Sequence, residues 1–255
     1  LNGEATGILF SIDRVGPVEL ATTSFGQGVS VTALQQVVAV SAAINGGTLY
    51  KPYIVKRIVE HETGQIIEEK KPIVVRKNII TEDTSLQVRM ALESVVSLGT
   101  GRNAYIDGYR VGGKTGTAQK VNNGAYMTGN YIVSFIGFLP ANDPEVVVYL
   151  AIDNPKGITQ YGGTVSAPIV KNIMEDAIVA LGIEKQEGGT EKEYQWYDKK
   201  YYTVDDVVGL TKKEATSILK KFTIEYSGSG NTVISQSPEA GNRIAEGASI
   251  RLYLG

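Results

Sequence analysis

The sequence contains no cysteine and a single histidine among its 255 residues. The absence of cysteine excludes disulfide bonds, thiolate catalysis and cysteine-ligated metals, and it is compatible with either an exported or a cytosolic protein. The one histidine, His61, lies in a segment with the composition of a hairpin turn and has no second histidine with which to share a metal ion. We therefore interpret His61 as a solvated turn residue, and we expect neither a metal site nor a cofactor.

Long apolar runs are also absent. No stretch approaches the ~18 apolar residues of a membrane-spanning helix, and no signal peptide is visible at the N-terminus. The net charge of −2 gives no indication of nucleic-acid binding, and the hydrophobic fraction of 42% is ordinary for a soluble globular protein. Because the first residue is Leu1 and not methionine, we interpret the chain as the interior of a longer protein.

The most informative segment is a strand-like run of small residues at 111–119, which contains Lys114, Thr115, Gly116 and Thr117. Lysine, threonine and glycine in this order form the third signature element of penicillin-binding proteins and class A β-lactamases. A cation can hold a substrate carboxylate, a hydroxyl group can hydrogen-bond it, and a glycine leaves room beside the strand. Because Thr115 and Thr117 alternate with Gly116, we expect their hydroxyl groups on one face of the strand.

Each of these residues also has an ordinary structural explanation. Lys114 would then be a surface lysine on an edge strand, and the threonines would pair across strands as in any sheet. The absence of a charged partner within 112–117 favours a functional role for the lysine.

Two features elsewhere in this part of the chain also have two explanations each. The Gly-Gly-Thr segment at 162–164 either rims a cleft or forms a turn, and we favour the turn. Tyr126, Tyr131 and Tyr161 either line a peptide groove or are ordinary sheet residues, because tyrosine is frequent in strands.

Hydrophobic periodicity predicts three helices within 1–182. The first spans 33–45, with Thr32 as N-cap and Gln35 reaching back to it, and its apolar or small residues on nearly all sides predict that it is buried. The second spans 81–98. The third is predicted to begin at Ala167, with Pro168 in its first turn, and to end near 181.

Strands are predicted at 53–60 and 65–69, joined by a turn at 62–64. Three further strands are predicted at 108–120, 130–139 and 145–153. The turn-forming residues of 140–144 predict that the last two form an antiparallel hairpin. Both faces of 132–139 are apolar, which predicts a central strand covered by helices.

The periodic pattern stops after residue 182. Glycine and charged residues predict a linker over 183–201. A compact unit of roughly 50 residues follows at 202–255, with an extended start at 203–208, a helix at 211–221, and strands at 223–226, 232–236 and 249–254. The sequence thus predicts two domains, at 1–182 and 202–255.

Three stretches of the first domain resemble the C-terminal half of the transpeptidase domain of class B penicillin-binding proteins. They are 24–28 with the predicted helix that follows, 113–118, and 134–138 with Pro140. The second domain resembles a PASTA domain through 207–210 and 233–241. The resemblance implies a mixed α/β (α+β) fold, with an antiparallel sheet covered by helices on both faces and a small αβ PASTA domain. A single PASTA domain resembles the sporulation-specific members most, with division-associated members as the alternative.

The resemblance implies a peptidoglycan D,D-transpeptidase that forms a serine acyl-enzyme with one stem peptide and transfers the acyl group to the amine of another. Lys114 would be the catalytic lysine, and Thr115, Gly116 and Thr117 would bind the substrate, with the Thr117 N–H in the oxyanion hole. The implied partners are stem peptides, β-lactam antibiotics and a membrane glycan polymerase, and no nucleic acid. The implied location is the outer face of the cytoplasmic membrane, with an anchor in an N-terminal segment outside this chain.

The family's serine-lysine and S-x-N motifs should precede the K-T-G motif, and this chain begins after both. Ser217 and Lys220 match S-x-x-K, and Ser229 and Asn231 match S-x-N, but all four follow Lys114. Such short patterns arise easily by chance, so we interpret them as coincidences. The nucleophilic serine is therefore expected in the missing N-terminal half, and this chain alone is expected to be inactive.

Two other functions are left open by the sequence. A non-catalytic peptidoglycan-binding or scaffold module is favoured by the lack of a visible nucleophile. β-Lactam hydrolysis would use the same K-T-G motif, but the linker and the small C-terminal domain argue against a secreted hydrolase. The C-terminal domain itself either binds peptidoglycan or is an inert appendage, and its lack of an aromatic cluster or a basic face slightly favours the inert role.

Overall fold

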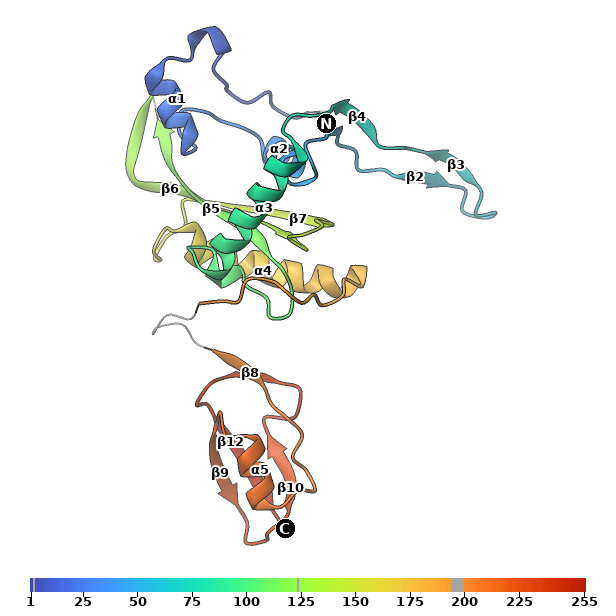
Figure 1. Ribbon diagram of the computed structural model, residues 1–255, viewed down its shortest axis with the longest axis vertical. Helices are drawn as coiled ribbons and strands as arrows, with labels where there is room; N and C mark the ends of the chain where they lie inside the picture. The colour runs from blue at the N-terminus through green and yellow to red at the C-terminus, as the bar shows by residue number, and fades with distance from the viewer. Residues whose placement is uncertain (2, 123, 194–199) are drawn as a thin grey trace. The chain divides into compact units, whose positions relative to one another are not determined.

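The structure, a computed structural model, describes residues 1, 3–122, 124–193 and 200–255. The chain divides into two compact units, 1–193 and 194–255. Each unit has its own hydrophobic core, and the first combines an antiparallel sheet with helices packed on both of its faces (Figure 1). The predicted mixed α/β fold is confirmed.

The main sheet of the first unit has the strand order β5-β6-β7, with β5 at Gly112–Asn122, β6 at Ala125–Leu139 and β7 at Val146–Asp153. Since β6 pairs antiparallel with both neighbours, the predictions of a central strand and of a hairpin formed by its last two strands are confirmed. β7 pairs only with the part of β6 from Ile132 onward. The first half of β6 and the end of β5 therefore extend as a two-stranded ribbon (Figure 1).

One face of this sheet is covered by α4 (Gly162–Leu181). Phe135 and Leu139 of β6 are fully buried in a core that they share with Val170 and Met174 of α4. The C-terminal part of α3 (Glu82–Ser97) adds Val96 to the same core. Burying one large apolar side chain stabilises a fold by about 1.5–3 kcal/mol, so this layer fixes the position of β6 firmly.

The opposite face of the sheet packs on α2 (Ala33–Ile44) through Phe138 and Ile44. The predicted cap of α2 is confirmed: Gln35 N donates to Thr32 Oγ1 at 3.1 Å, and Thr32 N donates to Gln35 Oε1 at 2.9 Å. The prediction that α2 is buried is only partly right, because Ala42 and Ile44 are its only buried residues. Apolar composition all round a helix does not by itself show that every side is covered.

α4 begins earlier than predicted. Its first residue is Gly162 and its N-cap is Tyr161, so Pro168 lies inside the helix and not in its first turn. A proline inside a helix lacks the N–H that would bind the carbonyl of the preceding turn. The additional N-terminal turn is held because its first residue, Gly162, is buried against the sheet.

A hairpin arm formed by β2 (Arg57–Val59) and β3 (Ile66–Glu69) projects from the first unit (Figure 1). The predicted hairpin is confirmed, with a shorter first strand, and His61 is exposed in its turn as expected. At its base β1 (Leu49–Lys51) pairs with β4 (Ile73–Arg76), which the sequence did not predict. The remaining elements of this unit are η1 (Ile12–Arg14), α1 (Pro17–Ser24) and η2 (Arg102–Ala104).

The segment that follows α4 is attached to the first unit, although it forms no helix or strand. Ile183 is buried, Gln186 N donates to Gly108 O at 3.0 Å, and Glu193 N donates to Ser97 O at 3.1 Å. Residues 194–199 of the predicted linker lie outside the described residues.

The second unit contains a three-stranded sheet in the order β10-β12-β9, with β9 at Thr223–Ser227, β10 at Val233–Ser237 and β12 at Ser249–Leu254. α5 (Lys212–Ile218) lies beside it, and Leu219 and Leu252 are fully buried in the common core. The predicted helix and three strands are confirmed, although the helix ends earlier. The pair of β8 (Tyr201–Thr203) and β11 (Arg243–Ala245) was not predicted.

Among the described residues, no helix of either unit has both the length and the apolar composition needed to cross a bilayer.

Candidate functional site

The K-T-G residues lie on β5, next to the central strand of the sheet. Lys114 is opposite Ile136 and Gly116 is opposite Ser134 in the antiparallel register. The Lys114 side chain is exposed, and its Nζ donates to the carbonyl oxygen of Thr115 at 2.9 Å. Its ammonium group is therefore accessible, and this local hydrogen bond holds its orientation.

The two threonines of the motif present their hydroxyl groups on the α4 side of the strand. Thr115 Oγ1 lies 3.2 Å from Thr100 Oγ1, and Gly162 N at the start of α4 donates to Thr117 Oγ1 at 3.5 Å. The expectation that both hydroxyls share one face is confirmed. Because Thr117 Oγ1 accepts a hydrogen bond here, its own proton stays available for a ligand.

The start of α4 touches the K-T-G strand so closely that only glycine fits there. A Cβ atom on Gly162 would overlap the carbonyl oxygen of Ser134 and lie 2.5 Å from that of Gly116. A Cβ on Gly163 would overlap the carbonyl oxygen of Thr100. The favoured interpretation of 162–164 as a simple turn is therefore wrong, since these residues form the first turn of a helix packed on the sheet.

The space beside Gly116 is also used by the protein itself. A Cβ on Gly116 would overlap the hydroxyl oxygen of Ser134. We expected this glycine to leave room for a ligand, but the space beside it is filled by the Ser134 side chain of β6. The glycine allows β5 and β6 to carry Ser134 at this position.

An ion pair fixes the entry of the chain into β5. Arg110, two residues before the strand, binds Glu93 of α3, with Nη2 and Oε2 2.7 Å apart. The hydrogen bond with Glu93 raises the pKa of Arg110 above its ordinary value. The start of the K-T-G strand is thereby held against α3.

The three tyrosines considered from the sequence do not gather into one cluster around Lys114. Tyr126 and Tyr161 are 52% and 61% exposed, whereas Tyr131 is half-buried and faces Gln119 of β5. Tyr126 lies far along the ribbon, opposite Val121. Tyr131, opposite Gln119, and Tyr161, next to Gly162, therefore lie nearer to Thr117 than Tyr126 does.

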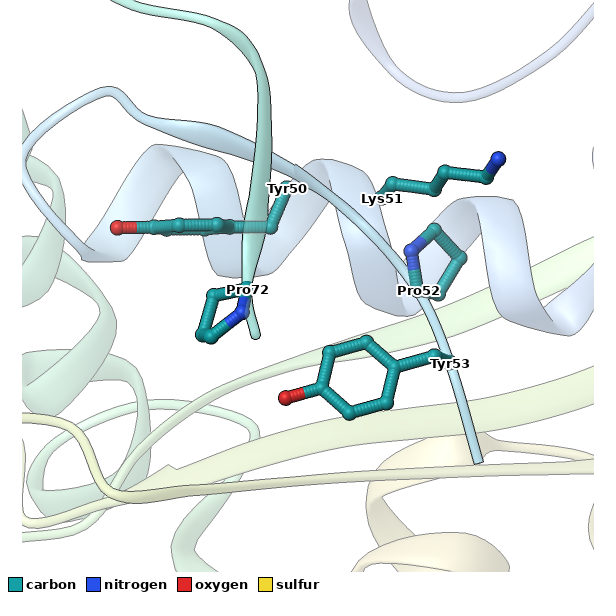
Figure 2. Close-up of a pocket in the computed structure, with 5 residues that line it drawn as sticks. All are labelled: Tyr50, Lys51, Pro52, Tyr53 and Pro72. Atoms are coloured by element: carbon teal, nitrogen blue, oxygen red, sulfur yellow. The ribbon is translucent and has the colours of Figure 1, made fainter. Parts of the chain in front are cut away.

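Two surface hollows are lined by residues other than those of the K-T-G motif. The first has a volume of about 370 Å³, and its lining residues are Tyr50, Lys51, Pro52, Tyr53 and Pro72. Figure 2 shows the hydroxyl groups of Tyr50 and Tyr53 pointing to the same side, with the Lys51 ammonium pointing away from them. The second, in the second unit, also measures about 370 Å³, and its lining residues are Glu225, Ser237, Pro238, Ser249, Arg251 and Tyr253.

The two serine patterns that follow the K-T-G motif lie on the second unit. Ser217 is exposed on α5, and Ser229 is exposed between β9 and β10. Within the described part of the chain, no group of three or more histidine, aspartate or glutamate side chains is placed to hold a metal ion.

Sequence reasoning missed several residues around β5. Thr100 contacts the motif directly, and Asn103 Nδ2 donates to Gly163 O at 2.8 Å, which ties η2 to the start of α4. Gln160 binds the edge of β6 through its side-chain amide. The adjacent glycines at 162 and 163 were a usable signal, because paired glycines often mark close approach of backbones.

Comparisons with known proteins agree with this geometry. A model of the penicillin binding protein transpeptidase domain matches residues 1–175, and a PASTA domain model matches residues 202–255. Stage V sporulation protein D of Bacillus subtilis (strain 168) is 57% identical over 254 residues, covering 100% of this chain and 39% of that protein. The probable peptidoglycan D,D-transpeptidase PenA of Neisseria meningitidis is 38% identical over 182 residues, covering 71% and 29%. The chain thus spans about two fifths or less of the length of these relatives.

Solved structures show the same relationship. Penicillin binding protein 3 of Mycobacterium tuberculosis, complexed with ampicillin, matches with a TM-score of 0.64 at 29% identity, over 76% of this chain and 45% of that one. Penicillin binding protein 2X of Streptococcus thermophilus matches with a TM-score of 0.59 over 99% of this chain and 38% of that one, and at 24% identity this likeness shows the fold alone.

The resemblance recognised in the sequence is therefore confirmed. The transpeptidase model covers well over half of the residues, and it includes the whole of β5 with the K-T-G motif. The chain belongs to the penicillin binding protein transpeptidase family, and it carries a PASTA domain after the transpeptidase part.

Proposed function

We propose that this chain is the K-T-G-bearing part of a class B peptidoglycan D,D-transpeptidase. The observation that carries the proposal is the layout of β5, where an exposed lysine precedes two threonines whose hydroxyl groups share one face. A cation and hydroxyl donors along one strand fit a substrate that ends in a carboxylate. A peptide ending in D-Ala-D-Ala has such a terminus, and the relative PenA is named a probable peptidoglycan D,D-transpeptidase.

The proposed reaction needs a serine from the part of the protein outside this chain. Its hydroxyl oxygen attacks the carbonyl carbon between the last two D-Ala residues of a stem peptide, the C–N bond breaks, and the terminal D-Ala leaves as the protonated amine. An amine of a second stem peptide then attacks the ester, forms the new peptide bond and returns the proton to the serine. A β-lactam acylates the same serine by opening its ring, and it keeps its leaving group attached.

Each residue of the motif has a role in this reaction. Lys114 presents its ammonium group to the proton network of the site, and the hydroxyls of Thr115 and Thr117 bind the substrate carboxylate. The backbone N–H of Thr117 stabilises the developing oxyanion, for which removal of one donor typically costs about 3–4 kcal/mol. Gly116 contributes by its lack of a side chain, which the contact with Ser134 requires.

The relatives also support a location and a division of the chain. We place the protein at the outer face of the cytoplasmic membrane, with an anchor outside this chain, and we assign it stem peptides, β-lactams and a membrane glycan polymerase as partners. The similarity to a sporulation protein supports a role in sporulation. We further propose domains at 1–182 and 202–255, joined through 183–201.

A fluorescent penicillin tests the proposal on the protein with its complete transpeptidase domain. The unaltered protein should form a covalent adduct, and a Lys114→Ala variant should do so far more slowly. Lys120→Ala is a matched control, because Lys120 lies on the same strand but binds Asp153 at 2.6 Å. Failure of the unaltered protein to react, while it still binds peptidoglycan, would favour the scaffold function. Equal rates for Lys114→Ala and Lys120→Ala would remove the role of Lys114, and rapid release of hydrolysed penicillin would favour β-lactam hydrolysis.

A further inference from the structure

The loop between β7 and α4, residues 154–161, is fastened to β6 at the point where β7 ends. The last β7–β6 pair joins Asp153 to Ile132. One position further along, Asn154 N donates to Tyr131 O at 2.8 Å. Gln160 Oε1 then accepts from Tyr131 N at 2.9 Å, and Gln160 Nε2 donates to Gly129 O at 3.2 Å.

The side-chain amide of Gln160 thus makes hydrogen bonds to β6 of the kind that a longer β7 would make with its backbone. One side chain reaches Tyr131 N and Gly129 O, so these backbone groups both face the loop. A glutamine amide carries an acceptor oxygen and a donor nitrogen, as a peptide group does. Through these two atoms Gln160 adds hydrogen bonds to β6 beyond Ile132, where the pairing with β7 ends. It therefore pairs backbone groups at the edge of the ribbon that would otherwise have no partner.

Neighbouring side chains hold the loop in this position. Asn154 Nδ2 donates to Asn130 Oδ1 at 2.8 Å, and Lys156 Nζ donates to Asn130 Oδ1 at 3.3 Å and to Asn154 Oδ1 at 2.9 Å. Asn154 adopts a positive φ of 51°, which asparagine tolerates better than most residues. The loop is therefore ordered from both of its ends.

The same loop leads directly into the contact with the K-T-G strand. Gln160 is two residues before Gly162, whose N–H donates to Thr117 Oγ1. On the other edge of β6, Tyr131 is opposite Gln119, and Gln119 is two residues beyond Thr117 on β5. Gln160 therefore supports β6 behind the stretch of β5 that carries Thr117.

We propose that Gln160 is a positioning residue of the acyl-transfer site. It fixes the first half of β6, and through this part of the sheet it fixes the backbone N–H of Thr117. This inference rests on the proposed transpeptidase function. A donor that stabilises a developing oxyanion is effective only when it is held in place before the reaction. Removal of the Gln160 amide frees two backbone groups of β6, so the β5–β6 ribbon loosens next to that donor.

The test uses Gln160→Met in the protein with its complete transpeptidase domain, because methionine keeps the length of the side chain and removes both hydrogen bonds. The rate constant of acylation by ampicillin, measured separately from its dissociation constant, should fall about tenfold, since small misplacements of reacting groups are costly. The dissociation constant should change less. Thr159→Ala, an exposed neighbour in the same loop, is the control and should leave both quantities unchanged.

Hydrogen exchange supplies a readout that does not depend on activity. The amide of Tyr131 should exchange faster in Gln160→Met, and Gln160→Glu, which keeps the acceptor for that amide, should restore part of the protection and part of the rate. Faster exchange with an unchanged acylation rate would overturn the inference, as would a slower rate without faster exchange. If Gln160→Met does not fold, Gln160→Glu, which loses only the hydrogen bond to Gly129 O, should still acylate more slowly than Thr159→Ala, and equal rates for these two variants would overturn the inference. If the unaltered protein does not react with ampicillin, the proposed function itself fails.

Discussion

Arg110 and Glu93 form a two-point ion pair, with Nε donating to Oε1 at 3.0 Å and Nη2 donating to Oε2 at 2.7 Å. Glu93 is only 4% exposed, and its Oε1 also accepts a hydrogen bond from Thr190 N at 3.3 Å. One buried carboxylate therefore connects α3, the residue that leads into β5, and the segment that follows α4. This connection fixes the position at which the K-T-G strand begins.

Replacing Arg110 by alanine should destabilise the first unit by about 2–3 kcal/mol. Loss of one partner of a buried pair costs about 3–5 kcal/mol, and a smaller loss is expected here because the Arg110 side chain is 23% exposed. Urea unfolding followed by circular dichroism measures the change. Lys171→Ala, which removes a more exposed pair with Glu175, should cost at most about 0.5 kcal/mol. Equal losses in the two variants would contradict the role given to Glu93.

Replacing Gly162 by alanine should both destabilise the first unit and slow acylation in the protein with its complete transpeptidase domain. The added methyl group meets the backbone carbonyls of Ser134 and Gly116, so α4 must shift, at a cost of about 1–3 kcal/mol. Thermal unfolding and the acylation rate measure the two effects. Thr164→Ala changes an exposed residue in the same turn and should be nearly neutral. A Gly162→Ala variant as stable and as reactive as Thr164→Ala would show that the close approach is not needed.

Replacing Leu252 by alanine should unfold the second unit and leave the first unit intact. Leu252 is fully buried in the core of the second unit, and loss of such a side chain costs about 2–5 kcal/mol, a large part of the stability of a small domain. Hydrogen exchange should become fast in β9 and β12 and stay slow in β6. The matched control is Arg251→Ala, which alters an exposed neighbour on the same strand. Loss of protection in β6 would contradict the proposed division into domains.

The stability of the second unit should fall at acidic pH partly because of Glu214. Its Oε2 accepts hydrogen bonds from Thr211 Oγ1 at 2.7 Å and from Thr211 N at 3.0 Å, and these lower the pKa of Glu214 below its ordinary value of 4.5. A lowered pKa in the folded state means that the contribution is complete above pH 4.5 and is lost as the pH falls through the lower value. A Glu214→Gln variant should therefore lose less stability than the unaltered chain between neutral and acidic pH.

Thermal unfolding at several pH values measures this difference. If Glu214→Gln loses as much stability between neutral and acidic pH as the unaltered chain, the capping hydrogen bonds of Glu214 do not contribute to the pH dependence.

Features that depend on nearby residues could be predicted from the sequence. Thr32 caps its helix as expected, because a cap is decided within one turn. The alternation of Thr115 and Thr117 followed directly from strand geometry. The start of α4 could not be predicted, since Gly162 is placed by contacts with Ser134 and Gly116, which are distant in the sequence.

The residues around the candidate site that the sequence did not predict also depend on contacts between distant parts of the chain. Gln160 belongs to no motif, and its importance arises only where the ladder between β6 and β7 stops. Thr100 follows α3 in a glycine-rich segment, and nothing in that segment indicates contact with Thr115, fifteen residues later. Burial of α2 also depended on the surroundings of the helix, which its own residues do not encode.

The arm formed by β2 and β3 makes the chain vulnerable to proteases at one place. Within the described residues these strands form a sheet of their own, and an isolated hairpin is only marginally stable in water. Lys56 and Arg57 lie where the chain enters the base of the arm, and Lys70 lies beside them where the chain leaves it, with Lys70 N donating to Lys56 O at 2.8 Å; all three are exposed. Trypsin should therefore excise the hairpin early in a digest, and the strand that carries Lys114 should survive in the remaining core.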